Sequence, residues 1–295
     1  MVLLKNEYNI NIEEKGSNNM AENCSTSECG SLEKCQGCPS NAKGGLLKPA
    51  HRLNKIRHVI GVVSGKGGVG KSSVTSMLAL EARQRGYKVG ILDADITGPS
   101  IPKAFGVVTQ AYGIQEGIVP AESSTGIKIM SINLLLEDPE QPVLWRGPVL
   151  GNMASQFWTD VIWGELDYLF VDMPPGTGDV PLTVFQSLPL SGIVVVSAAQ
   201  DLVSMIVGKA LHMANQMNIP VLGLIENMSY FICPNCNEKH YIFGQSHINE
   251  VAEKFNVPVL AQIPMNPDIA NLCDNGAIET LKNNPLKVVI DQIED

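Results

Sequence analysis

The sequence predicts an α/β protein whose doubly wound, mostly parallel sheet is flanked by helices. Near-continuous apolar runs of strand length recur along the chain, as in parallel strands that are buried on both faces. Helix-length segments separate most of these runs, which is the order that builds a parallel sheet. Hydrophobic residues make up 44% of the 295 residues and charged residues 17%, a balance that supplies a globular core.

Composition divides the chain into two parts. Residues 1–55 are rich in Ser, Asn, Glu, Gly and Lys, lack apolar periodicity and hold four of the seven cysteines. We expect this segment to be a flexible, cysteine-bearing tail, because it has too little apolar material to form a core. Residues 56–295 are expected to form the folded domain.

The expected elements of that domain follow one another from His58. A helix over 71–85 follows the first strand, and the segment from Asp201 to Met217 is the clearest of the later helices. The expected strands are HVIGVVS at 58–64, KVGILDAD at 88–95, IKIMSIN at 127–133, DYLFVDMP at 167–174, GIVVVSAA at 192–199, PVLGLIENM at 220–228 and PVLAQIP at 258–264. Ligands of such sheets bind at the carboxyl ends of the strands, so the loops there are the expected place for a site.

A glycine-rich loop directly follows the first expected strand and opens the first helix. GKGGVGKS fits the phosphate-binding pattern G-x-x-x-x-G-K-[ST], whose glycines let backbone N–H groups turn toward phosphate oxygens. Lys71 is placed to reach the terminal phosphates, and the Ser72 hydroxyl can bind Mg²⁺. The sequence thus predicts a P-loop for ATP with Mg²⁺, in which the nucleotide-binding residues are Gly65, Lys66, Gly67, Gly68, Val69, Gly70, Lys71, Ser72 and Ser73.

Acidic side chains end the neighbouring strands. Asp93 and Asp95 end the second strand, Asp172 ends DYLFVDMP, and Asp179 follows in PPGTGD. A lone Asp at such a place is often only a helix cap. Several carboxylates beside one P-loop can instead hold Mg²⁺ through water or orient the attacking water.

Lys66, inside the loop, is a residue that an ordinary P-loop does not require. With it the sequence resembles the deviant-Walker ATPases, the family that contains MinD, ParA and the nitrogenase iron protein. The resemblance implies that Lys66 crosses a homodimer interface to the partner's nucleotide. It also implies that Asp95 positions the attacking water and that Asp172 is the Walker B aspartate, so the expected catalytic residues are Lys66, Lys71, Asp95 and Asp172.

Further motifs narrow the resemblance. LDADITGPSIP, WRGP, DMPPGTGD and ENMSYFICPNC occur in this order, and residues 57–295 resemble the Mrp/ApbC branch of iron–sulfur carrier P-loop ATPases. The resemblance implies ATP hydrolysis coupled to transfer of a 4Fe–4S cluster from a cluster donor to apo-proteins. It also implies that Asn227 and the loop from Pro264 to Pro267 contact adenine, although an Asn at a strand end is commonly only a turn residue.

Cys233 and Cys236 place two thiols on one tight turn. Two ligands complete neither a tetrahedral zinc site nor a cluster, and the spacing alone leaves zinc and iron–sulfur equally open. The resemblance favours iron–sulfur, with a 4Fe–4S cluster that bridges two chains. An alternative is an intramolecular site that the pair completes with two cysteines of the tail.

The tail carries four more cysteines, Cys24, Cys29, Cys35 and Cys38, enough for one complete site. Its spacing departs from the N-terminal cluster of the eukaryotic scaffolds that the sequence otherwise resembles, so zinc stays an alternative to a second cluster. We expect Cys273 to be a small buried hydrophobe. No role is assigned to the histidines, because they show no paired ligand spacing: His51, His58, His212, His240 and His247.

Charge and hydropathy disfavour other classes. The net charge of −9 argues against nucleic acid as a partner, and neither a signal peptide nor a membrane-length apolar run is visible, so a cytoplasmic protein without a membrane partner is expected. Two alternatives remain. A MinD- or ParA-like positioning ATPase would need a membrane-targeting helix or a basic DNA surface, and an ATP-gated electron donor of the nitrogenase type would use isolated cysteines.

Overall fold

A parallel sheet of eight strands forms the centre of the fold. The structure is a computed structural model and describes residues 47–96, 98–136, 147–199 and 203–294. The strand order is β12-β9-β8-β1-β7-β2-β6-β5, and every neighbouring pair is parallel except β5 with β6. The strands are β1 (Lys55–Ser64), β2 (Val89–Asp93), β5 (Ala121–Glu122), β6 (Lys128–Met130), β7 (Glu165–Asp172), β8 (Gly192–Ala198), β9 (Val221–Asn227) and β12 (Val259–Gln262).

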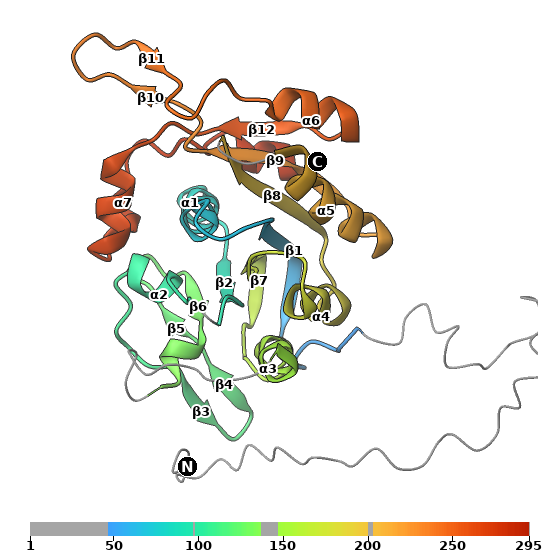
Figure 1. Cartoon of the computed structure of the whole chain (residues 1–295). Helices are drawn as coiled ribbons and strands as arrows, with labels where there is room; N and C mark the ends of the chain where they lie inside the picture. Colours follow the sequence, from blue (N-terminus) through green and yellow to red (C-terminus); the bar gives the residue numbers. More distant parts are fainter. Residues whose placement is uncertain (1–46, 97, 137–146, 200–202, 295) are drawn as a thin grey trace, which may run out of the picture. The chain divides into compact units, whose positions relative to one another are not determined.

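Helices cover both faces of this sheet, which confirms the predicted doubly wound α/β fold. Figure 1 shows α1 and α7 on one side of the sheet and α3, α4 and α5 on the other. The helices are α1 (Lys71–Gln84), α2 (Ile101–Ala104), α3 (Gly147–Thr159), α4 (Asp179–Ser187), α5 (Val203–Gln216), α6 (Ile248–Phe255), α7 (Pro267–Asp274) and α8 (Val289–Glu294).

The core lies between the sheet and these helices. The strands β1, β7 and β8 at the centre of the sheet are buried along most of their length, as their continuous apolar sequences require. Ile60 on β1 and Phe170 on β7 are each at most 2% exposed, and Trp163 just before β7 is fully buried. This packing holds the carboxyl ends of the central strands rigidly at one edge of the sheet.

Each expected strand exists, but IKIMSIN is shorter than predicted. The strand β6 ends at Met130, and Ile132–Leu134 form a 3₁₀ helix instead. Ser131 lies between the two elements and its hydroxyl donates to Asp93 Oδ2 at 3.2 Å, so this side chain is bound to the neighbouring strand end.

Two small hairpins lie outside the main sheet and were not predicted. One consists of β3 (Tyr112–Ile114) and β4 (Gly117–Val119), and the other of β10 (Phe231–Ile232) and β11 (Lys239–His240). Both have strands of two or three residues, too short for an alternating pattern to show. The second hairpin projects beyond β9 and β12 (Figure 1), and it carries Cys233 and Cys236 between its strands.

Candidate functional site

The P-loop lies at the carboxyl end of β1 and opens α1, as predicted. Gly68 and Gly70 have φ angles of 81° and 78°, in the left-handed region that favours glycine. The Gly70 carbonyl accepts from Val74 N at 3.0 Å and so begins the helix. The loop therefore presents its backbone and the helix N-terminus together, the arrangement that binds phosphate.

Asp172 is the centre of a buried hydrogen-bond cluster behind this loop. Lys71 Nζ lies 2.8 Å from Asp172 Oδ1, and Lys71 and Asp172 are 6% and 0% exposed. The Ser72 hydroxyl donates to Asp172 Oδ2 at 2.6 Å, and the Thr75 hydroxyl to Oδ1 at 2.8 Å. The sequence motifs did not indicate Thr75, which follows Ser72 by three residues and so faces the same strand end.

The two other carboxylates differ in position. Asp95 Oδ2 lies 3.6 Å from Lys71 Nζ, and the Asp95 side chain is partly exposed to solvent. Asp93 is fully buried and accepts hydrogen bonds from the backbone N–H of Asp95 and from the Ser131 hydroxyl. Burial is the main cause that raises the pKa of Asp93, and the negative charge of Asp172 raises it further, to about 8. This direction favours the protonated form of Asp93, whose buried side chain holds Asp95 and Ser131 in place.

Lys66 lies half-buried in the same loop, and its carbonyl accepts from the Ser64 hydroxyl at 2.9 Å. The structure contains one chain, so the role of Lys66 across a dimer stays a prediction.

Asn227, at the end of β9, contacts the P-loop directly. Its amide Nδ2 donates to the Val69 carbonyl at 3.0 Å, and its Oδ1 accepts from the backbone N–H of Met228. A Cβ on Gly70 would come within 2.2 Å of Asn227 Nδ2, so the loop passes this side chain at a distance that only glycine permits. The predicted adenine contacts of Asn227 and of residues 264–267 stay predictions.

The second candidate site is the β10–β11 hairpin. Cys233 N donates to the Glu238 carbonyl at 3.0 Å, and Asn237 N donates to the Cys233 carbonyl at 2.8 Å. Asn237 takes the left-handed conformation that closes the turn, with φ of 59°. The turn brings both cysteines to one side. Hydrogen bonds, first from the backbone of Cys236, lower the pKa of the Cys233 thiol and favour the thiolate that metals bind.

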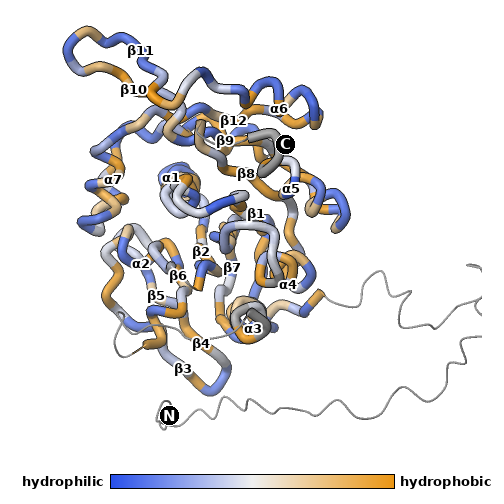
Figure 2. Tube along the Cα trace, in the orientation of Figure 1, coloured by the Kyte–Doolittle hydropathy of each residue, from blue (hydrophilic) through white to orange (hydrophobic). Residues whose placement is uncertain are grey.

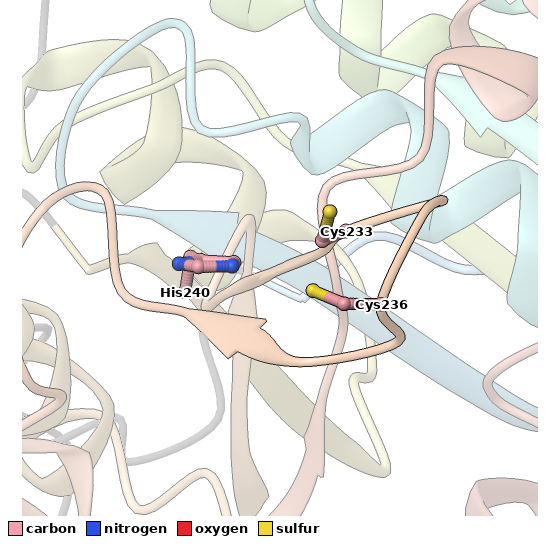
Figure 3. Close-up of side chains that lie close together, drawn as sticks. All are labelled: Cys233, Cys236 and His240. Carbon is pink, nitrogen blue, oxygen red and sulfur yellow. The ribbon is translucent and has the colours of Figure 1, made fainter.

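His240 corrects the view that no histidine has ligand spacing. The ligand atoms of Cys233, Cys236 and His240 all lie within 4.8 Å of one another. Figure 3 shows the imidazole beside the two sulfur atoms. The sequence signal for this group is the run Cys-x2-Cys-x3-His, in which the histidine is spaced from the cysteines and not from another histidine.

The surroundings of the hairpin are unusual for a surface. Ile232, Tyr241, Ile242 and Phe243 are 37–59% exposed. Figure 2 shows hydrophobic residues along β10 and hydrophilic ones along β11. A cluster of exposed apolar side chains beside a candidate metal site is typical of a surface that another protein covers.

The other cysteines have different places. Cys273 is half-buried, its Sγ lies 3.9 Å from Ser73 Oγ, and burial raises the pKa of its thiol. The tail cysteines Cys24, Cys29, Cys35 and Cys38 lie outside the described residues, as do Trp145 and Arg146 of the WRGP motif. Among the helices of the described part of the chain, none is long and apolar enough to cross a membrane.

Comparison with solved structures supports the nucleotide site. A nucleotide-binding protein from Archaeoglobus fulgidus, solved in complex with ADP, shares 44% identity with a TM-score of 0.71, over 78% of this chain and 90% of that one. The septum site-determining protein MinD of Pyrococcus horikoshii shares the fold at 19% identity, with a TM-score of 0.56, over 81% of this chain and 95% of that one.

The similar proteins of known name are iron–sulfur carrier or assembly proteins. Iron-sulfur cluster carrier proteins of Clostridium perfringens and Methanocaldococcus jannaschii are 44% and 45% identical, over 89% and 82% of this chain and 94% and 88% of theirs. A cytosolic Fe-S cluster assembly factor of Kluyveromyces lactis is 40% identical, over 86% of this chain and 95% of its own. The ParA family described as NUBPL iron-transfer P-loop NTPase matches residues 55–295. The chain therefore belongs to this family of nucleotide-binding P-loop NTPases.

Proposed function

We propose that the protein is an ATPase that carries 4Fe–4S clusters and delivers them to apo-proteins. The observation that carries this proposal is that the end of β9 contacts the P-loop and leads directly into the cysteine hairpin. Asn227 at the end of β9 touches the P-loop, and Cys233 follows it by six residues on the exposed hairpin. The names of the iron–sulfur carrier relatives support the same function.

Hydrolysis uses the cluster of polar side chains around Asp172. Lys71 would turn from Asp172 to the terminal phosphates of bound ATP, and the Ser72 hydroxyl would hold Mg²⁺, which supplies positive charge to the phosphates. Asp95 orients a water molecule, the γ-phosphoryl group passes to that water, and ADP and phosphate leave. Asp172 would then hold Mg²⁺ through water. In this scheme Lys66 reaches the nucleotide of a second chain.

Cluster binding follows from a count of thiolates. Cys233 and Cys236 offer two thiolates per chain, and a 4Fe–4S cluster takes four. Two chains therefore hold one cluster between their hairpins, and the exposed apolar residues beside the cysteines favour a second copy as the occupant of that surface. Cys24, Cys29, Cys35 and Cys38 are proposed to form a separate site for a second cluster or zinc.

The alternatives have less support. An electron donor with isolated cysteine ligands does not match the paired cysteines of the hairpin. A positioning ATPase gives the cysteine pair no function. The cytoplasmic location stays a prediction, which the name of the cytosolic relative from Kluyveromyces lactis supports.

Cluster transfer tests the proposal. The full chain, reconstituted anaerobically with iron and sulfide, is mixed with an apo-enzyme whose activity needs a 4Fe–4S cluster. We expect the enzyme to regain activity, and Cys233→Ser to lose most of this transfer. Cys273→Ser is the matched control and should transfer normally, because its thiol lies away from the hairpin. Equal transfer by Cys233→Ser would reject the hairpin as the carrier site.

A further inference from the structure

The hairpin of a single chain holds three ligands of the kind that bind a soft divalent cation. These are the two sulfur atoms of Cys233 and Cys236 and the imidazole of His240. All three residues are half-buried or exposed, so a metal ion can reach them from solvent. The ligand count per chain is therefore three and not two.

The spacing of the three ligand atoms fits one ion. Ligands at ~2.0–2.3 Å from a tetrahedral zinc lie about 3.5–3.8 Å apart. The atoms here lie within 4.8 Å of one another, so a closure of about 1 Å suffices, which exposed side chains achieve by small rotations. Cysteines on a 4Fe–4S cubane bind separate iron atoms and so stand farther apart than ligands of one ion. The three-ligand arrangement therefore matches a mononuclear site better than a cubane.

The fold of the hairpin fixes this arrangement. Phe231 pairs with His240 and Ile232 with Lys239, which sets His240 across from the start of the cysteine turn. The hydrogen bond from Cys233 N to the Glu238 carbonyl and the left-handed Asn237 close the turn between the two strands. All ligands come from eight consecutive residues, so binding orders little chain.

We propose that Cys233, Cys236 and His240 of one chain bind a single thiophilic divalent cation of the Zn²⁺ class, with water in the fourth position. The donor set of two thiolates and one imidazole with an open position is known for zinc. The site needs one chain only and does not depend on the proposed bridging cluster. It competes with that cluster, because both use the same thiolates.

A Co²⁺ titration tests the site in the full chain. Cys24, Cys29, Cys35 and Cys38 are replaced by Ser, so that the tail binds no metal. Co²⁺ is added anaerobically, its visible absorption reports tetrahedral thiolate coordination, and light scattering reports the mass of the same sample. We expect one Co²⁺ per chain on a monomer.

The variant His240→Ala separates this site from a pair of thiolates. Loss of an outer-shell partner of a ligand lowers metal affinity about 10–100-fold, and loss of the ligand itself should cost at least as much. We therefore expect His240→Ala to weaken Co²⁺ binding at least about tenfold and to change the visible spectrum. The control His247→Ala removes an exposed histidine of the same region, whose ring pairs with Glu250, and should leave both unchanged.

Two results would overturn the site. One is equal affinity and an equal spectrum for His240→Ala and the parent protein. The other is one Co²⁺ per two chains on a dimer, which indicates four thiolates. Iron and sulfide analysis of the same variants after cluster reconstitution reports the bridging cluster separately. A normal cluster with unchanged Co²⁺ binding in His240→Ala rejects the three-ligand site and leaves the proposed function standing.

Discussion

At the P-loop, a single buried carboxylate determines how the neighbouring side chains are arranged. Asp172 accepts from Lys71, Ser72 and Thr75, and it is fully buried. Two of these side chains, Lys71 and Ser72, are those that the P-loop pattern assigns to phosphate and Mg²⁺. The buried Asp172 carboxylate therefore fixes the positions of these side chains from behind the loop.

Substitutions at two residues of this cluster should affect ATP binding and ATP hydrolysis differently. Lys71→Ala should lose ATP binding, because this lysine is placed to reach the terminal phosphates. Asp95→Ala should still bind ATP but hydrolyse it about 100-fold or more slowly, because water is no longer oriented. Binding is measured with a fluorescent ATP analogue and turnover by phosphate release. Lys103→Ala, an exposed lysine, is the control. Turnover of Asp95→Ala at the parent rate would remove Asp95 from catalysis.

The raised pKa of Asp93 makes stability depend on pH. Its folded pKa of about 8 lies above the usual value of 3.8 for an aspartate, so between these values the folded state binds a proton that the unfolded state releases. The stability contribution of Asp93 therefore falls as pH rises from about 4 to about 8. Asp93→Asn removes this dependence. Its amide oxygen can still accept from the Asp95 N–H, and its NH2 group can donate to the Ser131 hydroxyl oxygen, which then accepts.

Urea unfolding of the protein without nucleotide measures this effect. Between pH 5 and pH 7 the parent should lose stability relative to Asp93→Asn by about 1.4 kcal/mol per pH unit. Asp274→Asn, with a side chain that is 76% exposed, should follow the parent. Parallel curves for the parent and Asp93→Asn would show that Asp93 is ionised in the folded protein.

Residues of the site whose signal is local were predictable from the sequence, and residues whose partners are remote were not. The P-loop and the aspartates at strand ends stand in short motifs with a fixed place in the fold. Thr75 meets Asp172 across 97 residues, so no motif joins them. His240 is different, because its signal is its spacing of four residues from Cys236 and not a spacing from another histidine.

At the scale of elements, the end of β9 connects the two sites. Successive side chains of a strand point to opposite faces. Asn227 reaches the P-loop, and Glu226 points to the other side, where it is fully buried. Glu226 accepts hydrogen bonds there from a group at the base of the hairpin, namely Ser229, Ser246 and Gln262.

Removal of this acceptor should be costly. Glu226→Ala leaves the buried Ser229 hydroxyl and the half-buried Ser246 hydroxyl without their acceptor and should lower the free energy of unfolding by about 2–3 kcal/mol. Urea denaturation at pH 7 measures the change. Glu250→Ala removes a glutamate that is 76% exposed and should change stability by less than about 0.5 kcal/mol. A loss that small for Glu226→Ala would contradict the structural role of this cluster.

Buried strands could be predicted from the sequence, and short exposed strands could not. Strands such as β1 and β8 are buried on both faces, and their long β-branched runs predicted them without ambiguity. The β10–β11 hairpin has strands of two residues and no buried face, so its sequence gives no periodicity. Its tight turn came from the cysteine spacing alone.

At the scale of the whole molecule, the proposed function requires two chains. The nucleotide loop follows β1 and the hairpin follows β9 of the same main sheet, and Lys66 and the cysteine pair are both proposed to meet a second copy. The fold class was predictable from the alternation of strands and helices. The proposed dimer was not predictable from the residues themselves, because a single sequence carries no direct signal of which surface meets its own copy, and only the resemblance indicated it.

The most direct test is the stoichiometry of the reconstituted protein. The full chain with Cys24, Cys29, Cys35 and Cys38 replaced by Ser is loaded anaerobically with iron and sulfide. Iron, sulfide and zinc are then determined on the sample whose mass is measured by light scattering. We predict a dimer with about four iron and four sulfide per two chains, and loss of both the cluster and the dimer in Cys236→Ser. A monomer that holds a complete cluster, or a dimer that holds only zinc, would contradict the bridging cluster.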